Sequence, residues 1–557
     1  MGTSTATSGI GCVGRRLFAV LGSSFSGVVA VCLVINLGAP RLISADVHGK
    51  KQDRTVVAQG RALFEREWQP SDSRTHGGDG LGPVYNDTSC VACHNMGGTG
   101  GAGSAGKNVD IITAAFNGQI PTEQPVGVHQ EQGFLSRAIG SLLGVEQPAK
   151  PAAEEKTAVK ATARKPERRK IDTTELVNAH PGFRTSRSVV LHRFGTDETY
   201  EQWRQTFVGF QRGNVRRGQA GNGMMLAQLA ANADADAVAM QNQIGQFFIT
   251  RSQRNPTALF GAGLIDSIAD SDIEAAAKVK YPDFPEIAGR VSRLKDKRIG
   301  RFGWKSQTVS LSDFVLTACA VELGLEVPAH HQGGSPQRPE AAAKGLDLNA
   351  QECESLVAYV SDLPRPAERK PESEREAKEI EVGRGLFAKV GCATCHSPKL
   401  GKVENIYSDL LLHDLGPALG DVGQYAVFDP SSSEDEIVDD PGSVAVISES
   451  PRRRMIGAGM SPSFVAADAQ QVKRPTSGPA SRFERRTPAL WGLRDSAPYL
   501  HDGRAKTLDQ AIAFHGGEAG GIAQRFFKLT AKERGQFEAF LKSLTAPAPA
   551  ELVASAK

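Results

Sequence analysis

The chain has 557 residues, of which 40% are hydrophobic, and it contains 59 glycines and 30 prolines. This length predicts two to four domains, and the apolar fraction is sufficient for a packed core. A formal net charge of +3 gives no support for nucleic-acid binding, and the glycine and proline content indicates many loops rather than a helical bundle.

Residues 1–45 are typical of an export signal. Arg15 and Arg16 come just before an apolar stretch, residues 17–36, and small residues lead up to Ala45. A basic start, an apolar centre and a cleavage position after Ala45 make up a signal peptide, which we favour. The apolar stretch is also long enough to remain as a membrane anchor. Either alternative places the rest of the chain outside the cytoplasm, as in a periplasmic protein.

The first candidate site follows a predicted helix over residues 54–68. The stretch SCVACHNMGG places Cys90 and Cys93 three residues apart, with His94 directly after the second cysteine. This is the attachment pattern of c-type haem, in which two thiols on one helical turn bond to the vinyl groups and the histidine binds the iron. A zinc site needs more ligands close by, and a thioredoxin-like dithiol needs a βαβ context. We therefore predict a covalent haem here.

The rest of the first half carries weaker signals. Residues 146–170 are rich in Pro, Ala, Lys and Glu, so we expect a disordered insertion there. His192 and Trp203 are candidates to line the pocket of the first haem, and Trp304 is a candidate to lie between two haems. Packing in an ordinary core is the alternative for each of these side chains.

Two cysteines stand outside the haem pattern in this region. Cys319 and Cys353 could form a disulfide in an oxidising compartment, and the sequence leaves that pairing open. Residues 364–375 are rich in Pro and in charged side chains, which is typical of a connection between two parts of a chain.

The haem pattern recurs in the second half, where CATCH places Cys392, Cys395 and His396 at the same spacing. Composition alone predicts on the order of 0.002 such matches in a chain of this length, and two are present. We therefore predict two covalently bound c-type haems, with His94 and His396 as iron ligands.

Both motifs belong to a longer internal repeat. GRALF at residues 60–64 precedes the first motif, and GRGLF at residues 383–387 precedes the second. Further along, RNPTALFG at residues 254–261 matches RRTPALWG at residues 485–492. In a cytochrome c-like fold, a helix of this kind crosses a C-terminal helix beside the haem, and a small residue permits the close approach.

This duplication predicts the fold class and the domain boundaries. We expect a mainly α protein with two cytochrome c-like haem domains and long irregular loops. The first domain would span residues 46–370 with the insertion at 146–170, and the second would span residues 371–557 with a polar insertion at 431–481.

The two halves diverge after the second repeated string. In the second half, Thr507 is a predicted N-cap of a short helix over residues 508–514, which ends at His515. In the first half, Ser271 would cap a similar helix, and the place of His515 is taken by a residue within 278–281, none of them a histidine. The far side of the first iron would then be open or weakly held, by water, Trp203 or Tyr281. A C-capping role at the helix end is the alternative for His515.

The strings GDGLGPVYNDTSCVACH, GRFGWKSQ, YSDLLLHDLG and RTPALWGLRDSAPYLHDGRAKTLDQAIAFHGGEA resemble the bacterial di-haem c-type oxidoreductases that are classed with peroxidases. These are distantly similar to di-haem cytochrome c peroxidases, MauG-type enzymes and haem rubber oxygenases. The resemblance covers roughly residues 55–544. It implies that His515 is the distal iron ligand of the C-terminal haem, opposite His396. His413 and His501 are the rival ligands, and we expect them to lie beside the haem instead.

The asymmetry of the halves predicts a division of labour. An N-terminal haem with an open or weakly filled position would react with peroxide or another small oxidant, and a C-terminal bis-histidine haem would transfer electrons from a donor cytochrome or another redox protein. We assign no catalytic side chain. The alternative is a non-catalytic di-haem electron-transfer protein. The rubber-oxygenase resemblance alone suggests a third, weaker alternative, which is haem-dependent oxygen cleavage of an apolar substrate.

Overall fold

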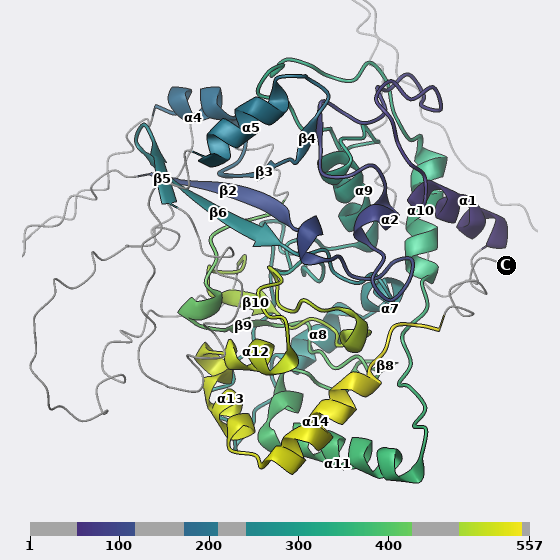
Figure 1. Ribbon diagram of the computed structural model, residues 1–557, viewed down its shortest axis with the longest axis vertical. Helices are drawn as coiled ribbons and strands as arrows, with labels where there is room; N and C mark the ends of the chain where they lie inside the picture. Colours follow the sequence, from purple (N-terminus) through teal and green to yellow (C-terminus); the bar gives the residue numbers. More distant parts are fainter. Residues whose placement is uncertain (1–52, 117–171, 210–240, 426–477, 549–557) are drawn as a thin grey trace, which may run out of the picture. The chain divides into compact units, whose positions relative to one another are not determined.

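A computed structural model describes most of the chain between Asp53 and Ala548 (Figure 1). Contacts divide the chain into two units, Met1–Asp46 and Val47–Lys557, and all described residues lie in the second. The described residues are 53–116, 172–209, 241–425 and 478–548.

Several predictions fall outside these residues. They are the targeting segment at 1–45, the insertion at 146–170 and nearly all of the insertion at 431–481. Within the described ranges, no helix has the length and apolar character needed to cross a membrane.

Short helices make up most of the regular secondary structure in the described residues, and the longest, α11, has 17 residues. Side-chain N-caps begin many of them, and Asn349, Thr507 and Thr530 form complete capping boxes. The α-helices are α1 (Arg54–Phe64), α2 (Cys90–Cys93), α4 (Thr174–Ala179), α5 (Tyr200–Gly209), α7 (Ala262–Asp266), α8 (Asp270–Ala276), α9 (Leu311–Glu322), α10 (Ala350–Asp362), α11 (Glu374–Val390), α12 (Leu508–Ala513), α13 (Gly520–Phe527) and α14 (Ala531–Ser543).

Ten short strands form four antiparallel sheets in the described residues. The largest sheet has the order β3-β2-β6-β5, and the others pair β1 with β4, β9 with β10 and β7 with β8. The strands are β1 (Val84–Tyr85), β2 (Val109–Phe116), β3 (Ser188–Leu191), β4 (Phe194–Gly195), β5 (Gln241–Ile244), β6 (Phe247–Arg254), β7 (Lys399–Leu400), β8 (Val403–Glu404), β9 (Leu412–Asp414) and β10 (Glu484–Arg486).

The four-stranded sheet has its own small core. Ile112 and Ala114 alternate along β2 and face the same side, where Leu176 of α4 packs with them. Trp203 and Phe207 of α5 pack against the same cluster. Figure 1 shows α4 and α5 beside this sheet.

The predicted fold class is therefore wrong. Strand accounts for 15% of the structure beside 37% helix, and residues 47–557 form one compact unit rather than two cytochrome c-like haem domains. The missed sheet has a physical reason. Strand β2 pairs with β6, so that Ile112 lies opposite Arg251, and such distant partners leave no local signal around either strand.

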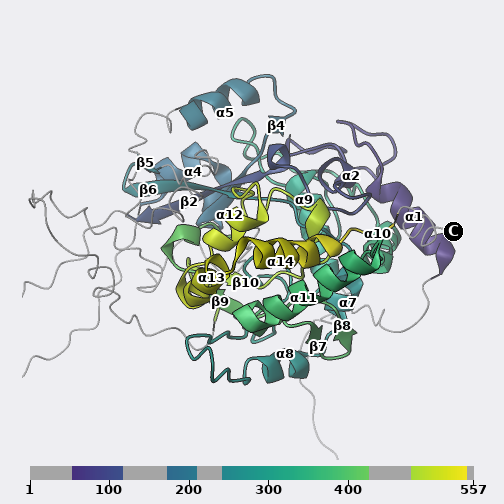
Figure 2. The same cartoon turned by 60° about the horizontal axis from the view of Figure 1, so that its bottom comes forward.

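Two helix pairs position the haem motifs. Helix α1 packs against α10, and α11 packs against α14, as Figure 2 shows for the second pair. Each pair has its own apolar core, one including Cys90 and the other including Cys392 and Cys395. The predicted close crossing of a helix before each motif is thus present as a local arrangement within the single unit.

Candidate functional site

The first cysteine pair lies on a single helical turn. Ser89 is the N-cap of α2, and its hydroxyl oxygen accepts a hydrogen bond from the amide of Ala92 at 3.3 Å. The turn holds Cys90 and Cys93 as free thiols on half-buried positions. Burial raises the pKa of Cys90 to about 12, so the thiol is uncharged near neutral pH.

His94 is held in one orientation by the loop that follows it. Its Nδ1 lies 3.2 Å from the carbonyl oxygen of Gly101. A carbonyl only accepts, so Nδ1 carries the proton and Nε2 keeps its lone pair. Burial lowers the pKa of His94, which favours this neutral form.

The second motif has the same design on a tighter turn. Residues Cys392–Thr394 form a 3-10 turn after Gly391, whose φ is 114°. The Thr394 hydroxyl donates to the Gly391 carbonyl at 2.7 Å. The Nδ1 of His396 donates to the carbonyl of Tyr407 at 3.0 Å, so its Nε2 also keeps a lone pair.

The repeated strings before the motifs have a shared role. The ring of Phe64, the last residue of GRALF, lies 6.5 Å from the ring of His94, measured between centroids. The ring of Phe387, the last residue of GRGLF, lies 6.4 Å from that of His396. Each helix therefore places an aromatic ring against the histidine of the motif that follows.

His515 comes close to His396. Thr507 caps α12 as predicted, and His515 follows the end of this helix, where its Nδ1 donates to the Ala511 carbonyl at 2.7 Å. Burial and the neighbouring His515 lower the pKa of His396 to about 4. Like the two motif histidines, His515 therefore has a protonated Nδ1 and an Nε2 that keeps its lone pair.

His413 is buried between two carboxylates. Its Nε2 lies 2.9 Å from Asp409 Oδ2, and its Nδ1 lies 2.9 Å from Glu518 Oε2 and 3.5 Å from Cys395 Sγ. Burial lowers the pKa of His413, but Asp409 and the Cys395 thiol outweigh this effect and raise it well above its usual value. Both nitrogens are thus engaged beside the second motif.

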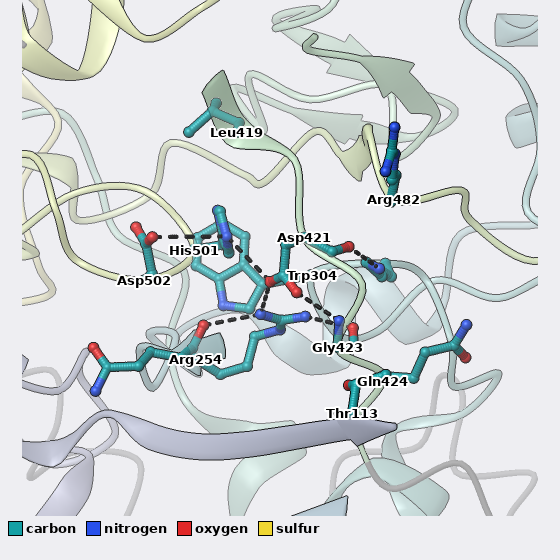
Figure 3. Close-up of polar contacts among 12 residues, drawn as sticks. Thr113, Arg254, Trp304, Leu419, Asp421, Gly423, Gln424, Arg482, His501 and Asp502 are labelled. Carbon is teal, nitrogen blue, oxygen red and sulfur yellow. Dashed lines mark hydrogen bonds and ion pairs between the residues drawn. The ribbon is translucent and has the colours of Figure 1, made fainter. Parts of the chain in front are cut away.

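His501 belongs to a different cluster, which Figure 3 shows. Its Nε2 lies 3.3 Å from Asp421 Oδ2, and its ring meets that of Trp304 edge-on with centroids 6.3 Å apart. The indole of Trp304 donates to the carbonyl of Asn255 at 3.1 Å. These contacts hold the imidazole of His501 against a carboxylate.

The two candidates for lining the first haem pocket pack in the protein interior. Trp203 stacks on Phe207, with ring centroids 5.2 Å apart, in the core of the four-stranded sheet. His192 is buried, and its Nε2 lies 2.7 Å from the carbonyl of Val321 at the end of α9. Trp203 therefore packs in an ordinary core, which was the alternative to a place in the haem pocket. His192 is also buried in the protein interior.

The structure also places three other groups that the sequence singled out. Tyr281 packs against the core of the second motif rather than the first. Burial raises the pKa of Tyr281, and the neighbouring Asp409 and Cys395 add to that shift. Helix α8 begins at Asp270 after Ala269, so Ser271 is inside its first turn and does not cap it. Cys319 and Cys353 are both buried in the core of the first motif and remain free thiols.

Sequence reasoning missed an acidic group beside the first motif. Glu322, at the end of α9, accepts hydrogen bonds from Tyr425 and from the amide of Asn86. Burial raises the pKa of Glu322. Burial also raises the pKa of Cys93, and the carboxylates of Asp87 and Glu322 add to that shift. Residues from three distant segments meet here, so the linear sequence carried no signal for it.

The residues of both motifs suit a covalent haem. Each offers two free thiols on one turn and a neutral histidine whose Nδ1 donates to a backbone carbonyl. A hydrogen bond from Nδ1 to a backbone carbonyl is the usual support of an imidazole that binds metal through Nε2. The donor set therefore fits iron in a porphyrin.

The model of a family described as "Di-haem oxidoreductase, putative peroxidase" matches residues 49–120 and 477–544. The first segment contains Cys90, Cys93 and His94, and the second contains His515. The resemblance predicted from the sequence is thus confirmed, and the match supports a di-haem oxidoreductase that uses haem cofactors.

Two solved structures are similar at low identity. Hydrazine synthase of Kuenenia stuttgartiensis, pressurised with xenon, is 17% identical with a TM-score of 0.26, over 71% of this chain and 100% of that one. A MauG-like protein associated with microbial copper homeostasis is 15% identical with a TM-score of 0.23, over 52% of this chain and 93% of that one. The curated proteins contain no match.

Proposed function

We propose that this protein is a di-haem c-type oxidoreductase with peroxidase-type activity. The proposed attachment uses the thiols of each cysteine pair, and His94 and His396 bind iron through Nε2. The orientation of both rings by backbone carbonyls supports these roles, because it leaves Nε2 as the ligand atom.

One observation carries the functional part of the proposal. His515 follows α12, whose Leu508 and Ile512 pack in the same apolar core as the second cysteine pair. Together with burial, His515 lowers the pKa of His396, and we assign His515 as the sixth iron ligand of the C-terminal haem. For His94, burial lowers the pKa and two backbone carbonyls oppose the shift, with no second imidazole contributing among the described residues. Among the described residues, a second imidazole therefore affects the pKa of His396 but not that of His94.

This difference supports a division of labour. A haem iron with one free axial position reacts with peroxide, whereas an iron held by two imidazoles exchanges electrons. The N-terminal site would take the oxidant, and the C-terminal site would receive electrons from a donor cytochrome or another redox protein. Glu322 lies near Cys93 as a half-buried acid with a raised pKa and is a candidate to hold a proton there.

We also propose that the protein acts outside the cytoplasm. Residues 1–45 would direct the chain out of the cytoplasm, either as a cleaved signal peptide or as a membrane anchor. A periplasmic location would bring the protein together with soluble donor cytochromes.

Peroxide turnover tests the proposal. Full-length protein made with a c-type maturation system should keep two haems after denaturation, and it should oxidise a reduced cytochrome when peroxide is added. The Cys90→Ser, Cys93→Ser variant should lose turnover and keep one haem. The matched control is Cys319→Ser, at a buried thiol outside both motifs, which should keep both haems and the activity.

The alternative is a non-catalytic electron-transfer protein. It predicts electron exchange with a partner cytochrome at the same rate with and without peroxide. Protein that holds two haems and shows no peroxide-dependent oxidation with any donor would favour this alternative. Zinc in place of iron in the purified protein would overturn both.

A further inference from the structure

The segment that follows the second motif has an unusual backbone. Asn405, Tyr407 and Leu410 adopt left-handed conformations, with φ of 54°, 49° and 57°. Residues other than glycine rarely adopt this conformation, and it is costly for a bulky side chain. Residues 406–413 are also buried, with exposed fractions of at most 3%. Such strain persists only where the surrounding contacts fix it, and it is concentrated at functional sites.

The backbone carbonyls of this segment hold two functional side chains. The carbonyl oxygen of Tyr407 accepts the Nδ1 hydrogen bond of His396 at 3.0 Å. The carbonyl oxygen of Asn405 accepts from the indole of Trp491, in the second repeated string, at 2.7 Å. The left-handed backbone at Tyr407 is therefore the part of the segment that contacts the predicted iron ligand.

Tyr407 is anchored at its other end by an ion pair. Its hydroxyl donates to Glu368 Oε1 at 3.0 Å and accepts from Arg384 Nη1 at 2.6 Å. Arg384 also pairs with Glu368, with 2.5 Å between Nη2 and Oε2. The hydrogen bond from Arg384 lowers the pKa of Glu368, so this carboxylate stays ionised near neutral pH and is a strong acceptor.

The ring of Tyr407 lies between these two ends and packs beside the histidine. Its centroid lies 6.1 Å from that of Phe387 and 5.5 Å from that of Phe540. Phe387 is also the ring that lies against His396. A shift of the Tyr407 side chain would therefore disturb both the carbonyl and the packing around His396.

The first motif has a different acceptor. The Nδ1 of His94 donates to the carbonyl of Gly101, at the longer distance of 3.2 Å. Gly101 has no side chain, and Gly98 and Gly100 before it have φ of 125° and 91°. The carbonyl that orients His94 thus cannot be anchored through a side chain of its own residue, as that of Tyr407 is.

We propose that Tyr407 is a positioning residue for the C-terminal haem. Anchored by Arg384 and Glu368, it keeps its carbonyl on His396 and fixes the plane of the imidazole. A hydrogen bond from Nδ1 makes the imidazole a stronger ligand to iron. The inference rests on the haem proposed above, and a ligand held in one orientation suits the electron-transfer role proposed for that site.

The test uses the full-length holoprotein with Tyr407→Phe, which keeps the ring and removes the hydroxyl. Tyr359→Phe is the matched control, because it removes a buried hydroxyl on a ring that packs against Phe64 at the first motif. Asn405→Gly is the second control, because it relieves backbone strain at a residue whose carbonyl does not hold His396. Electron paramagnetic resonance of the ferric protein reports the orientation of the ligand planes, and redox titration reports the potential of each haem.

In Tyr407→Phe the carbonyl is no longer anchored on Nδ1, and the imidazole stabilises ferric iron less. We expect the C-terminal haem to become easier to reduce by a factor of at least about three in the equilibrium constant, which is about 28 mV for one electron. Its low-spin signal should shift, while the N-terminal haem and both controls match the wild type. An unchanged signal and potential in Tyr407→Phe overturn the proposal, even where the protein loses stability.

Glu368→Gln provides the same test if Tyr407→Phe does not fold. It removes the charged acceptor of the Tyr407 hydroxyl at a half-buried position. Glu381→Gln is its control, because it removes a charge beside the same Arg384 on a side chain that is 76% exposed. A shifted low-spin signal in Glu368→Gln alone supports the proposal, and identical signals in the two variants overturn it.

Protein that holds no haem would contradict the proposed function and still decide this inference. In that protein the Nδ1 proton of His396 should exchange slowly with water, as followed by nuclear magnetic resonance, and Tyr407→Phe should speed the exchange. Equal exchange in both proteins would overturn the positioning role of Tyr407.

Discussion

Gly383 of α11 packs directly on the backbone of Gln536 in α14. A Cβ atom placed on Gly383 would lie 2.0 Å from the carbonyl oxygen of Gln536. The same relationship occurs between Gly60 of α1 and Ser355 of α10, at 1.8 Å. The glycine that begins each repeated string is therefore what lets the helix before each haem motif cross its partner closely.

Gly383→Ala should destabilise the protein by about 1–3 kcal/mol, because the methyl group forces the two helices apart. Gly385→Ala, two residues along the same helix, is the control. A Cβ at Gly385 meets nothing within 4 Å, so this change should stabilise the helix by about 0.5–1 kcal/mol. Denaturant unfolding measures both, and equal effects of the two changes would contradict the close crossing.

His413→Leu should cost about 3–5 kcal/mol of stability, because it leaves Asp409 and Glu518 buried without their cationic partner. His331→Ala removes a similar pair with Glu326, but the His331 side chain is 83% exposed, and we expect a change below about 1 kcal/mol. Denaturant unfolding compares them. A loss for His413→Leu no larger than that for His331→Ala would contradict the carboxylate cage.

His515→Met should raise the reduction potential of the C-terminal haem, because a thioether ligand favours ferrous iron more than an imidazole does. His515→Ala should open the same iron to added ligands. Optical redox titration and the low-spin spectrum report both effects, with His331→Ala as control. An unchanged spectrum and potential in His515→Met would exclude His515 as the ligand.

Asp347 should make stability depend on pH in an unusual direction. It accepts hydrogen bonds from the amides of Gly80 and Glu326, each at 2.7 Å, yet burial raises its pKa to about 6 from an ordinary value near 3.8. The folded state then holds this proton more tightly than the unfolded state, so stability falls as pH rises between about 4 and 6.

The variant Asp347→Asn removes this titration. Its unfolding free energy, subtracted from that of the wild type, should give a difference that decreases from pH 4 to pH 6 and is flat above. A difference that instead grows with pH would mean that the two amide donors dominate and that the pKa of Asp347 is lowered.

Local features were predictable from the sequence. The cap at Thr507, the helix after it and the close crossing at Gly60 and Gly383 each depend on residues a few positions apart or on the repeat of a short string. The cysteine pairs were visible for the same reason, because one helical turn sets the spacing between Cys90 and Cys93.

Contacts between distant segments were not predictable. The pairing of β2 with β6 links residues on either side of a long stretch of chain. Neither strand shows the regular alternation of buried and exposed residues by which a strand is predicted from sequence. The contacts of Asp421 with Arg254, Arg485 and Lys305 likewise bring together four separate segments. Only folding brings such groups together, so the linear sequence holds no sign of them.

Cyanide binding followed by electron paramagnetic resonance tests most directly whether the two haem sites are unequal. We expect that one haem per chain binds cyanide, that this haem is absent from the Cys90→Ser, Cys93→Ser variant, and that the other stays low-spin with two imidazole ligands. Two low-spin haems that both fail to bind cyanide, even after partial reduction, would contradict unequal sites and favour a protein that only transfers electrons.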